Sequence, residues 1–165
     1  DKGYETLMPK GLFEGEGDAM FVEGVLYGGY GFRSSPEEYQ EIADFLEVEV
    51  VLLELVDPRF YHFDTCFTVL DSRTVAFFPA AFSKDSQATI RQSFERVIEV
   101  AEEDAVAFGL NTFSDQTNVI TSAQATGFHE QLEEAGYIVH PVDVSEFRKS
   151  GGGIKCLTLL LDQIH

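Results

Sequence analysis

The sequence predicts a single α/β domain built from about three ββαβ-like repeats. Three observations indicate this fold: short apolar strands come in pairs, an amphipathic helix follows a pair, and a further apolar strand follows the helix. No linker rich in proline or serine divides the chain, and 165 residues suit one core better than two. We therefore expect residues 1–165 to form one domain.

The first repeat has the clearest signals. Two short strands, 19–22 and 25–27, are separated by a Glu-Gly turn that is typical of a hairpin. Ser35, followed by a proline and, three residues on, a glutamate, marks the start of a helix. A mostly apolar segment, 48–55, reads as a strand that is covered on both faces. The predicted apolar face of the helix consists of Tyr39, Ile42, Ala43 and Leu46.

The second repeat is predicted from the same order of patterns. Segments 63–70 and 74–78 read as two strands around a polar turn. A longer helix is expected from about Asp85. Its predicted apolar side consists of Ile90, Phe94, Val97, Ile98 and Ala101.

The third repeat begins with a predicted strand at 118–121. A helix with apolar positions at Phe128, Leu132 and Ala135 should end at Gly136. The strand 137–142 contains a proline, which suggests that it stops there or lies at a sheet edge. After a polar loop, we expect a last apolar strand at 157–161.

The charge balance limits the classes of partner. The chain has 11 basic and 29 acidic residues, a net charge of −18, which disfavours nucleic acid and anionic membranes and favours cations. No apolar run approaches the ~20 residues of a membrane span. Two cysteines form no disulfide framework, which suits a reducing compartment, so we expect a cytoplasmic protein.

A glycine triplet at 151–153 precedes Cys156. Glycine allows sharp turns and lets a ligand approach the backbone closely. A thiol held at the start of a strand and reached through such a loop suits a nucleophile. The alternative is that Cys156 is a small buried residue, because free cysteine is often buried.

The segment His62-Phe63-Asp64-Thr65-Cys66 is a second candidate site. In a strand, His62, Asp64 and Cys66 would share one face, and His62 with Asp64 would combine proton transfer with recognition of a cation. The alternative is a solvated strand rim. We disfavour a metal site, since three side chains on one stiff strand point in parallel and do not converge on an ion.

Glu14, Glu16 and Asp18 alternate with glycines near the start of the chain. The segment lacks the spacing of a calcium loop, and its three carboxylates would repel phosphate. It suits a guanidinium or an ammonium held by paired carboxylates, unless it is a turn with solvated acids.

The order of these segments, 13–18, 31–35, 62–64 and 151–156, resembles the guanidino-group-modifying enzymes of the pentein superfamily. These include arginine deiminases, dimethylarginine dimethylaminohydrolases and amidinotransferases. The resemblance covers nearly the whole chain. The His-x-Asp form is closer to deiminases, arginine dihydrolases and amidinotransferases than to the mammalian-type dimethylaminohydrolases, which lack that aspartate.

The resemblance implies a role for each matching residue. Cys156 would be the nucleophile, His62 the general acid and base, and Glu14 the carboxylate beside His62. The implied substrate-binding residues are Asp64, Asp18, Arg33 and Gly152, with Arg33 on the substrate α-carboxylate. Neither a metal nor a cofactor is implied. The common form of the acidic motif is Glu-Gly-Gly-Asp, so Glu16 is an inserted residue here.

The resemblance also implies a fold and a function. Penteins close five repeats into an α/β-propeller, so this chain would be the C-terminal portion, completed by N-terminal repeats of the same protein or by another chain, with a homo-oligomer possible. The implied function is hydrolysis at the guanidino carbon of arginine or N-methylated arginine through a cysteine-bound thiouronium, releasing an amine or ammonia. The alternatives are amidino transfer to an amine and a non-catalytic guanidine-binding fragment.

Overall fold

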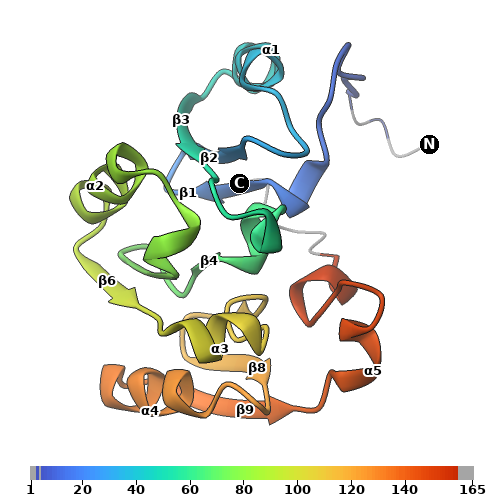
Figure 1. The fold of residues 1–165 in the computed structure, drawn as a ribbon. Coiled ribbons are helices and arrows are strands. Elements are labelled where there is room, and N and C mark those ends of the chain that lie inside the picture. Colours follow the sequence, from blue (N-terminus) through green and yellow to red (C-terminus); the bar gives the residue numbers. More distant parts are fainter. Residues whose placement is uncertain (1–2, 4, 160–165) are drawn as a thin grey trace.

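A computed structural model describes residue 3 and residues 5–159 of the chain. It contains three three-stranded sheets, each made of consecutive strands, with the orders β1-β2-β3, β4-β5-β6 and β7-β8-β9 (Figure 1). In each sheet the first two strands are antiparallel, and the third pairs in parallel with the second. The predicted α/β fold of three ββαβ repeats is confirmed.

The first repeat agrees with the sequence prediction. It comprises β1 (Ala19–Val22), β2 (Val25–Tyr30), α1 (Pro36–Leu46) and β3 (Glu49–Glu54). Tyr39 on the apolar face of α1 is fully buried, and its hydroxyl donates to the carbonyl oxygen of Gly29 at 2.7 Å. The exception is Leu46, which is exposed at the end of the helix.

The second repeat departs from the prediction at its first strand. It comprises β4 (Phe67–Val69), β5 (Thr74–Phe77), α2 (Lys84–Ser93) and β6 (Arg96–Glu99). The predicted strand 63–70 is wrong at its start, where Phe63–Thr65 forms a 3-10 turn, η3. The amide of Phe63 donates to the Asp18 carboxylate, so a tertiary hydrogen bond takes a group that a strand would use in its ladder.

The predicted helix from Asp85 to Ala101 is also too long. It ends at Ser93, and Val97 and Ile98 lie in β6, where they pair with Val75 and Ala76 of β5. A short apolar run is compatible with both the helical and the strand period. Here the edge of β5 offers backbone partners, so residues 96–99 form a strand. A short helix that we did not predict, α3 (Glu102–Val106), follows β6.

The third repeat comprises β7 (Phe113–Ser114), β8 (Asn118–Ser122), α4 (Thr126–Ala135) and β9 (Ile138–Val142). Gly136 ends α4 in the left-handed conformation, with φ +99°, as predicted. The proline-containing strand β9 lies at the edge of its sheet, also as predicted. A short helix, α5 (Ser145–Arg148), leads into the glycine triplet.

The predicted last strand is wrong in its described part. Lys155–Leu157 forms a 3-10 turn, η5, and the prediction at 160–161 lies outside the described residues. Cys156 therefore sits within a tight turn and not at the start of a strand. This turn is held by its contacts with Asn111, whose carbonyl oxygen accepts the Lys155 amide at 3.3 Å.

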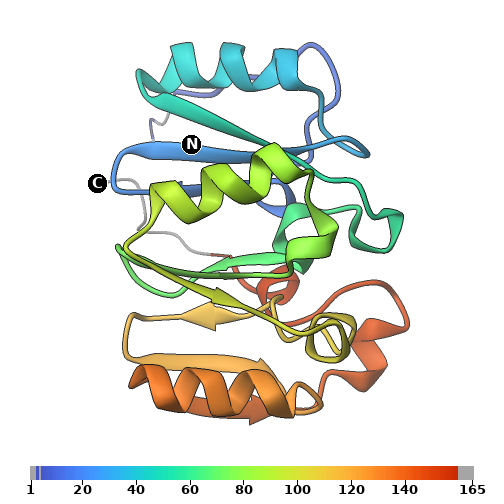
Figure 2. The ribbon, with the colours of Figure 1, turned by 60° about the vertical axis from the view of Figure 1, so that its left-hand side comes forward.

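The three repeats share one core. The sheets lie next to one another, and α1, α2 and α4 lie on the periphery (Figures 1 and 2). One cluster of buried apolar residues runs through all three repeats, and aromatic rings make up much of it. A second, smaller cluster of Leu26, Tyr39 and Ile42 lies between α1 and the first sheet. The largest fully buried rings are Tyr39, Phe63, Phe67, Phe77, Phe82 and Phe128. Within the described ranges, no helix is long and apolar enough to cross a membrane.

Candidate active site

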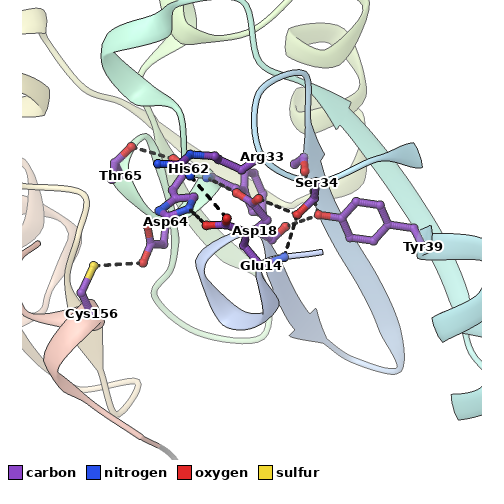
Figure 3. A network of polar contacts seen from close by, with 11 residues as sticks. Glu14, Asp18, Arg33, Ser34, Tyr39, His62, Asp64, Thr65 and Cys156 are labelled. Atoms are coloured by element: carbon purple, nitrogen blue, oxygen red, sulfur yellow. Dashed lines mark hydrogen bonds and ion pairs between the residues drawn. The ribbon is translucent and has the colours of Figure 1, made fainter. Parts of the chain in front are cut away.

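Three 3-10 turns from distant parts of the chain meet at the candidate site. They are η1 (Gly15–Gly17), η3 (Phe63–Thr65) and η5 (Lys155–Leu157). Side-chain contacts join η1 to η3, η3 to η5 and η1 to η5. The turns therefore bring the acidic motif, the His-x-Asp motif and the cysteine motif into one place (Figure 3).

Asp18, directly after η1, is a buried carboxylate that holds two segments together. Its side chain is 1% exposed; Oδ1 accepts from the Phe63 amide at 3.0 Å, and Oδ2 accepts from the Ser34 hydroxyl at 2.6 Å. The Ser34 hydroxyl oxygen in turn accepts from the Glu14 amide at 3.0 Å. Burial raises the pKa of Asp18, and the bonds from Ser34 and Phe63 oppose that shift. Both oxygens thus serve protein donors, and this geometry does not favour the predicted contact of Asp18 with substrate.

Glu14 is the member of the acidic motif that contacts His62. The Glu14 Oε2 and His62 Nε2 atoms lie 2.6 Å apart, while Glu16 forms an ion pair with Lys155 at 2.5 Å. The His62 ring packs over Gly17, where a Cβ atom would lie 3.6 Å from the ring. That distance is an ordinary van der Waals contact, so Gly17, between Glu16 and Asp18, packs against the imidazole without a clash that would demand glycine.

Arg33 lies on the other side of Glu14. Its guanidinium nitrogen Nη1 is 3.5 Å from Glu14 Oε1, and its guanidinium carbon is 5.0 Å from the centre of the Tyr61 ring. Half of the Arg33 side chain is exposed. The cation is held loosely and can still accept an anionic group, as the prediction for Arg33 requires.

Asp64 differs from Asp18 because its carboxylate is incompletely satisfied. The residue is 3% exposed, and its Oδ2 atom accepts from the Cys156 thiol at 3.4 Å. Among the described residues, its Oδ1 atom is buried and has no hydrogen-bond partner. Burial raises the pKa of Asp64 to about 6. A cation with N–H groups would supply the partner that Oδ1 lacks.

Cys156 and Cys66 have opposite environments. Cys156 is exposed at the surface, although its sulfur is flanked by Asp64 and by Asn111, whose Nδ2 lies 3.2 Å away. Burial and the Asp64 carboxylate raise the pKa of Cys156. Cys66 is fully buried, its sulfur lies 3.5 Å from the Phe63 carbonyl oxygen, and burial raises its pKa well above the usual value. Only Cys156 of the two can meet a ligand.

The glycine triplet packs tightly around the cysteine turn. Gly151 has φ +82°, and a Cβ atom there would lie 2.9 Å from the Tyr61 hydroxyl. A Cβ atom at Gly153 would lie 2.7 Å from Asn111 Oδ1. Gly152 lies beside Cys156, but its amide donates to the Phe147 carbonyl oxygen at 3.4 Å. That amide is used within the protein, so it does not point to a ligand contact by Gly152.

The expectation that His62, Asp64 and Cys66 share a strand face is wrong. The turn η3 sends the Asp64 side chain toward Cys156 and the Cys66 side chain into the core. Within the part of the chain that the structure describes, no group of three metal-ligating side chains comes together.

Sequence reasoning missed three residues at the site. Asn111 contacts Cys156, Ser34 links Glu14 to Asp18, and Tyr61 lies between Arg33 and the glycine triplet. Ser34 lies in the segment 31–35 and Tyr61 precedes the histidine, so their neighbours could have indicated them. Asn111 lies in a segment with no motif, and only the fold brings it to the site.

Comparisons with known proteins find relatives over nearly the whole chain. The family model for eukaryotic N,N dimethylarginine dimethylhydrolase matches residues 4–161. An N(G),N(G)-dimethylarginine dimethylaminohydrolase of Mycobacterium tuberculosis is 45% identical over 99% of this chain and 53% of its own length. A bifunctional arginine dihydrolase/ornithine cyclodeaminase of Nostoc, AgrE, is 40% identical over 99% of this chain and 25% of its length.

Solved structures give the same fold. The product-bound N-terminal domain of ArgZ, a cyanobacterial arginine dihydrolase, matches with a TM-score of 0.87 and 41% identity over 92% of this chain and 57% of that one. The dimethylarginine dimethylaminohydrolase of Pseudomonas aeruginosa, complexed with citrulline, gives a TM-score of 0.70 and 26% identity over 83% and 51% of the two chains. The chain spans about half the length of the mycobacterial relative and of these two structures.

Proposed function

The chain belongs to the N,N dimethylarginine dimethylhydrolase family, and we propose that it carries the reacting cysteine and the acid–base pair of a hydrolase acting on a guanidino carbon. The substrate is arginine or an N-methylated arginine. Cys156 is the nucleophile, His62 the general acid and base, and Glu14 the carboxylate that holds His62. Asp64 binds the guanidinium, and Arg33 receives the α-carboxylate.

One observation carries the proposal. A buried carboxylate, Asp64, has a free oxygen on one side and the Cys156 thiol on the other, 3.4 Å from Oδ2. A guanidinium that pairs with Asp64 places its carbon next to the sulfur, because the cation is planar and its N–H groups surround that carbon. Binding the cation and aligning the nucleophile are then the same event.

The bound cation also changes the ionisation of the thiol. In the absence of a ligand, burial and the Asp64 charge raise the pKa of Cys156, so the thiol keeps its proton. A guanidinium beside both groups pairs with Asp64 and favours the thiolate, since an opposite charge within a few ångströms stabilises the charged form. The free thiol is thereby protected from unwanted reactions, and it becomes nucleophilic when substrate is present.

The remaining steps need one proton donor that becomes an acceptor. The thiolate forms a C–S bond to the guanidinium carbon, giving a tetrahedral adduct. Imidazolium His62 protonates the leaving nitrogen, the C–N bond breaks, and a cationic thiouronium and a neutral amine or ammonia result. Neutral His62 then takes a proton from water, and hydroxide adds to the same carbon. The C–S bond breaks as the hydroxyl proton of this adduct passes to the departing sulfur, which gives the neutral ureide and the Cys156 thiol. Glu14, 2.6 Å from Nε2, stabilises the imidazolium stage.

The relatives support this choice of substrate. The N-terminal domain of ArgZ is described as an arginine dihydrolase and was crystallised with substrate and with product, and a further structure holds a covalent reaction intermediate. The His-x-Asp form of residues 62–64 resembles the deiminases and arginine dihydrolases. Hydrolysis of arginine with release of ammonia is therefore the first activity to assay.

We also propose that residues 1–165 form one domain that corresponds to the C-terminal three repeats of a five-repeat pentein ring. Two facts support this: the described residues form three repeats, and the chain spans 53% of the mycobacterial relative and 57% of the ArgZ domain. The remaining repeats would then supply further substrate contacts. The 165-residue chain alone should turn over guanidines poorly, and the missing repeats, added in cis or in trans, should restore activity. Ordinary turnover by the monomeric 165-residue chain would contradict this.

The function is tested by covalent labelling and turnover. A haloacetamidine mimics the guanidinium and alkylates the thiolate beside it, so one label should map to Cys156, and excess arginine should protect. Cys156→Ser should abolish both labelling and citrulline formation, whereas Cys66→Ala should leave the labelling in place. A label on Cys66, or full turnover by Cys156→Ser, would exclude the mechanism.

A further inference from the structure

We propose that Asn111 is a positioning residue of this site: its side-chain amide ties Cys156 to the Asp64 segment and donates an N–H group to the sulfur. The inference rests on the proposed function of Cys156 and extends it to a residue that no motif indicates. Asn111 follows α3 and precedes β7, so it belongs to the third repeat. It is fully buried.

One amide group makes all the relevant contacts. The Nδ2 atom lies 3.2 Å from the Asp64 carbonyl oxygen and 3.2 Å from the Cys156 sulfur. The Oδ1 atom accepts from the Cys156 amide at 3.4 Å. Two N–H groups and one oxygen of Asn111 thus bond to Asp64 and Cys156. The separation of these two residues determines whether a guanidinium bound by Asp64 reaches the sulfur.

The contacts of Asn111 join two turns that are far apart in the sequence. Asp64 lies in the turn η3 of the second repeat, and Cys156 lies in η5, 92 residues later. The direct contact between their side chains is a single long bond from the thiol, which is lost when the thiol ionises. The amide of Asn111 keeps its bonds in both ionisation states. It therefore holds the sulfur in place during the steps in which the thiol proton is absent.

The backbone around Cys156 is adapted to Asn111. A side chain at Gly153 would bring a Cβ atom within 2.7 Å of Asn111 Oδ1, and the Lys155 amide donates to the Asn111 carbonyl oxygen. The last glycine of the triplet is therefore required for close approach to Asn111 and not for an unusual φ. This gives the third glycine a structural reason that the sequence alone did not supply.

The amide also acts on the charge of the sulfur. The Gly153 backbone N–H and the Asn111 side-chain N–H both stabilise a thiolate and lower the pKa of Cys156, which opposes the effects of burial and of Asp64. The other charged groups nearby are engaged elsewhere, since Lys155 pairs with Glu16 and His62 pairs with Glu14. Of the charged side chains that the structure describes near the sulfur, Asp64 is the one that contacts it, and it disfavours the thiolate.

The test measures the ionisation of Cys156 without substrate. The rate of iodoacetamide labelling at Cys156 in the full-length protein is followed against pH, with the site identified by peptide mapping. Asn111→Leu keeps the approximate shape but removes the donor, and it should raise the midpoint by about one pH unit, roughly tenfold in thiolate fraction at neutral pH. The control, Thr121→Val, removes a buried hydrogen bond of the same repeat, to the Gly109 carbonyl oxygen, in which neither Asn111 nor Cys156 takes part. It should lower stability and leave the midpoint unchanged.

An unchanged midpoint in folded Asn111→Leu, or equal shifts in both variants, would overturn the proposal. If Asn111→Leu does not fold, the proposal is tested on the unmodified protein by NMR. The side-chain ¹⁵N resonance of Asn111 should shift with pH at the labelling midpoint of Cys156, and a resonance that does not respond there would equally overturn the proposal. Because no turnover is measured, either result can be obtained even if the proposed reaction is incorrect.

Discussion

Two buried carboxylates of the site, Asp18 and Asp64, lie in contrasting surroundings. Asp18 accepts two short bonds, from Ser34 and from the Phe63 amide, and both of its oxygens are occupied. Asp64 is buried to a similar degree, but one oxygen has only a thiol as donor and the other has no partner among the described residues. A satisfied buried charge belongs to the scaffold, whereas an unsatisfied one is an energetic cost that a ligand can remove.

The same contrast extends to the groups around them. The proposed acid–base pair is already assembled, with Glu14 and His62 2.6 Å apart. Beside the proposed nucleophile, Asp64 and Asn111 lie 3.4 Å and 3.2 Å from the Cys156 sulfur. One half of the site is organised before substrate arrives, and we expect substrate to complete the other half.

The largest expected effect comes from the assembled half. His62→Ala should lower the chemical step by ~10²–10⁴-fold with little change in guanidine binding, because it removes the proton donor but no cation contact. Glu14→Gln keeps the shape and should cost less, since the imidazole remains. Single-turnover kinetics on the complete enzyme separate the chemical step from binding. Equal, small effects of both variants would mean that the pair is structural.

The comparison of the two aspartates is sharpened by matched substitutions to asparagine. Asp64 has a pKa of about 6 in the folded state, above its usual value, so between pH ~4 and ~6 the folded protein binds the proton that the unfolded chain has released. The contribution of this group to the free energy of unfolding is therefore fully present below pH ~4. It falls by about 3 kcal/mol in total as the pH rises to ~6. Asp64→Asn should lack this loss and should also weaken guanidine binding.

Asp18→Asn should behave differently. The Ser34 hydroxyl loses the acceptor it now uses, and the free energy of unfolding should fall by about 1–3 kcal/mol at neutral pH. The free energy of unfolding of both variants and of the parent protein is measured by urea denaturation from pH 4 to 8. The contrast between the two sites would be refuted if Asp64→Asn followed the parent's pH dependence, or if Asp18→Asn were as stable as the parent.

The smallest expected effect concerns the link between the two halves. Lys155 and Glu16 form an ion pair at 2.5 Å between the acidic motif and the cysteine turn; the Lys155 side chain is 15% exposed and the Glu16 side chain 51%. Lys155→Met keeps the mostly buried aliphatic part of the side chain and removes a charge whose partner is half in solvent, so it should change the free energy of unfolding by no more than about 1 kcal/mol. Its effect should decrease further at high salt. A loss of several kcal/mol in thermal or urea unfolding would show that this pair holds the halves together.

The sequence by itself determined the repeats and the identities of most site residues. Hairpin turns, the helix start at Ser35 and the C-terminal Gly136 depend on local backbone chemistry, so each could be read from neighbouring residues. The candidate residues Glu14, His62, Asp64 and Cys156 were found from motif order and resemblance, and the structure brings them together.

Only the tertiary structure decided how these residues are used. Residues 63–65 form a turn where a strand was expected, and the turn 155–157 includes the first residue of the strand expected at 157–161. Distant groups, the Asp18 carboxylate and Asn111, accept backbone amides of these two turns. The same long-range contacts gave Asp18 two donors and left Asp64 with an open oxygen, a difference that two aspartates in a sequence cannot display. Asn111 reached the site because the third repeat packs against the second, and no local pattern encodes that contact.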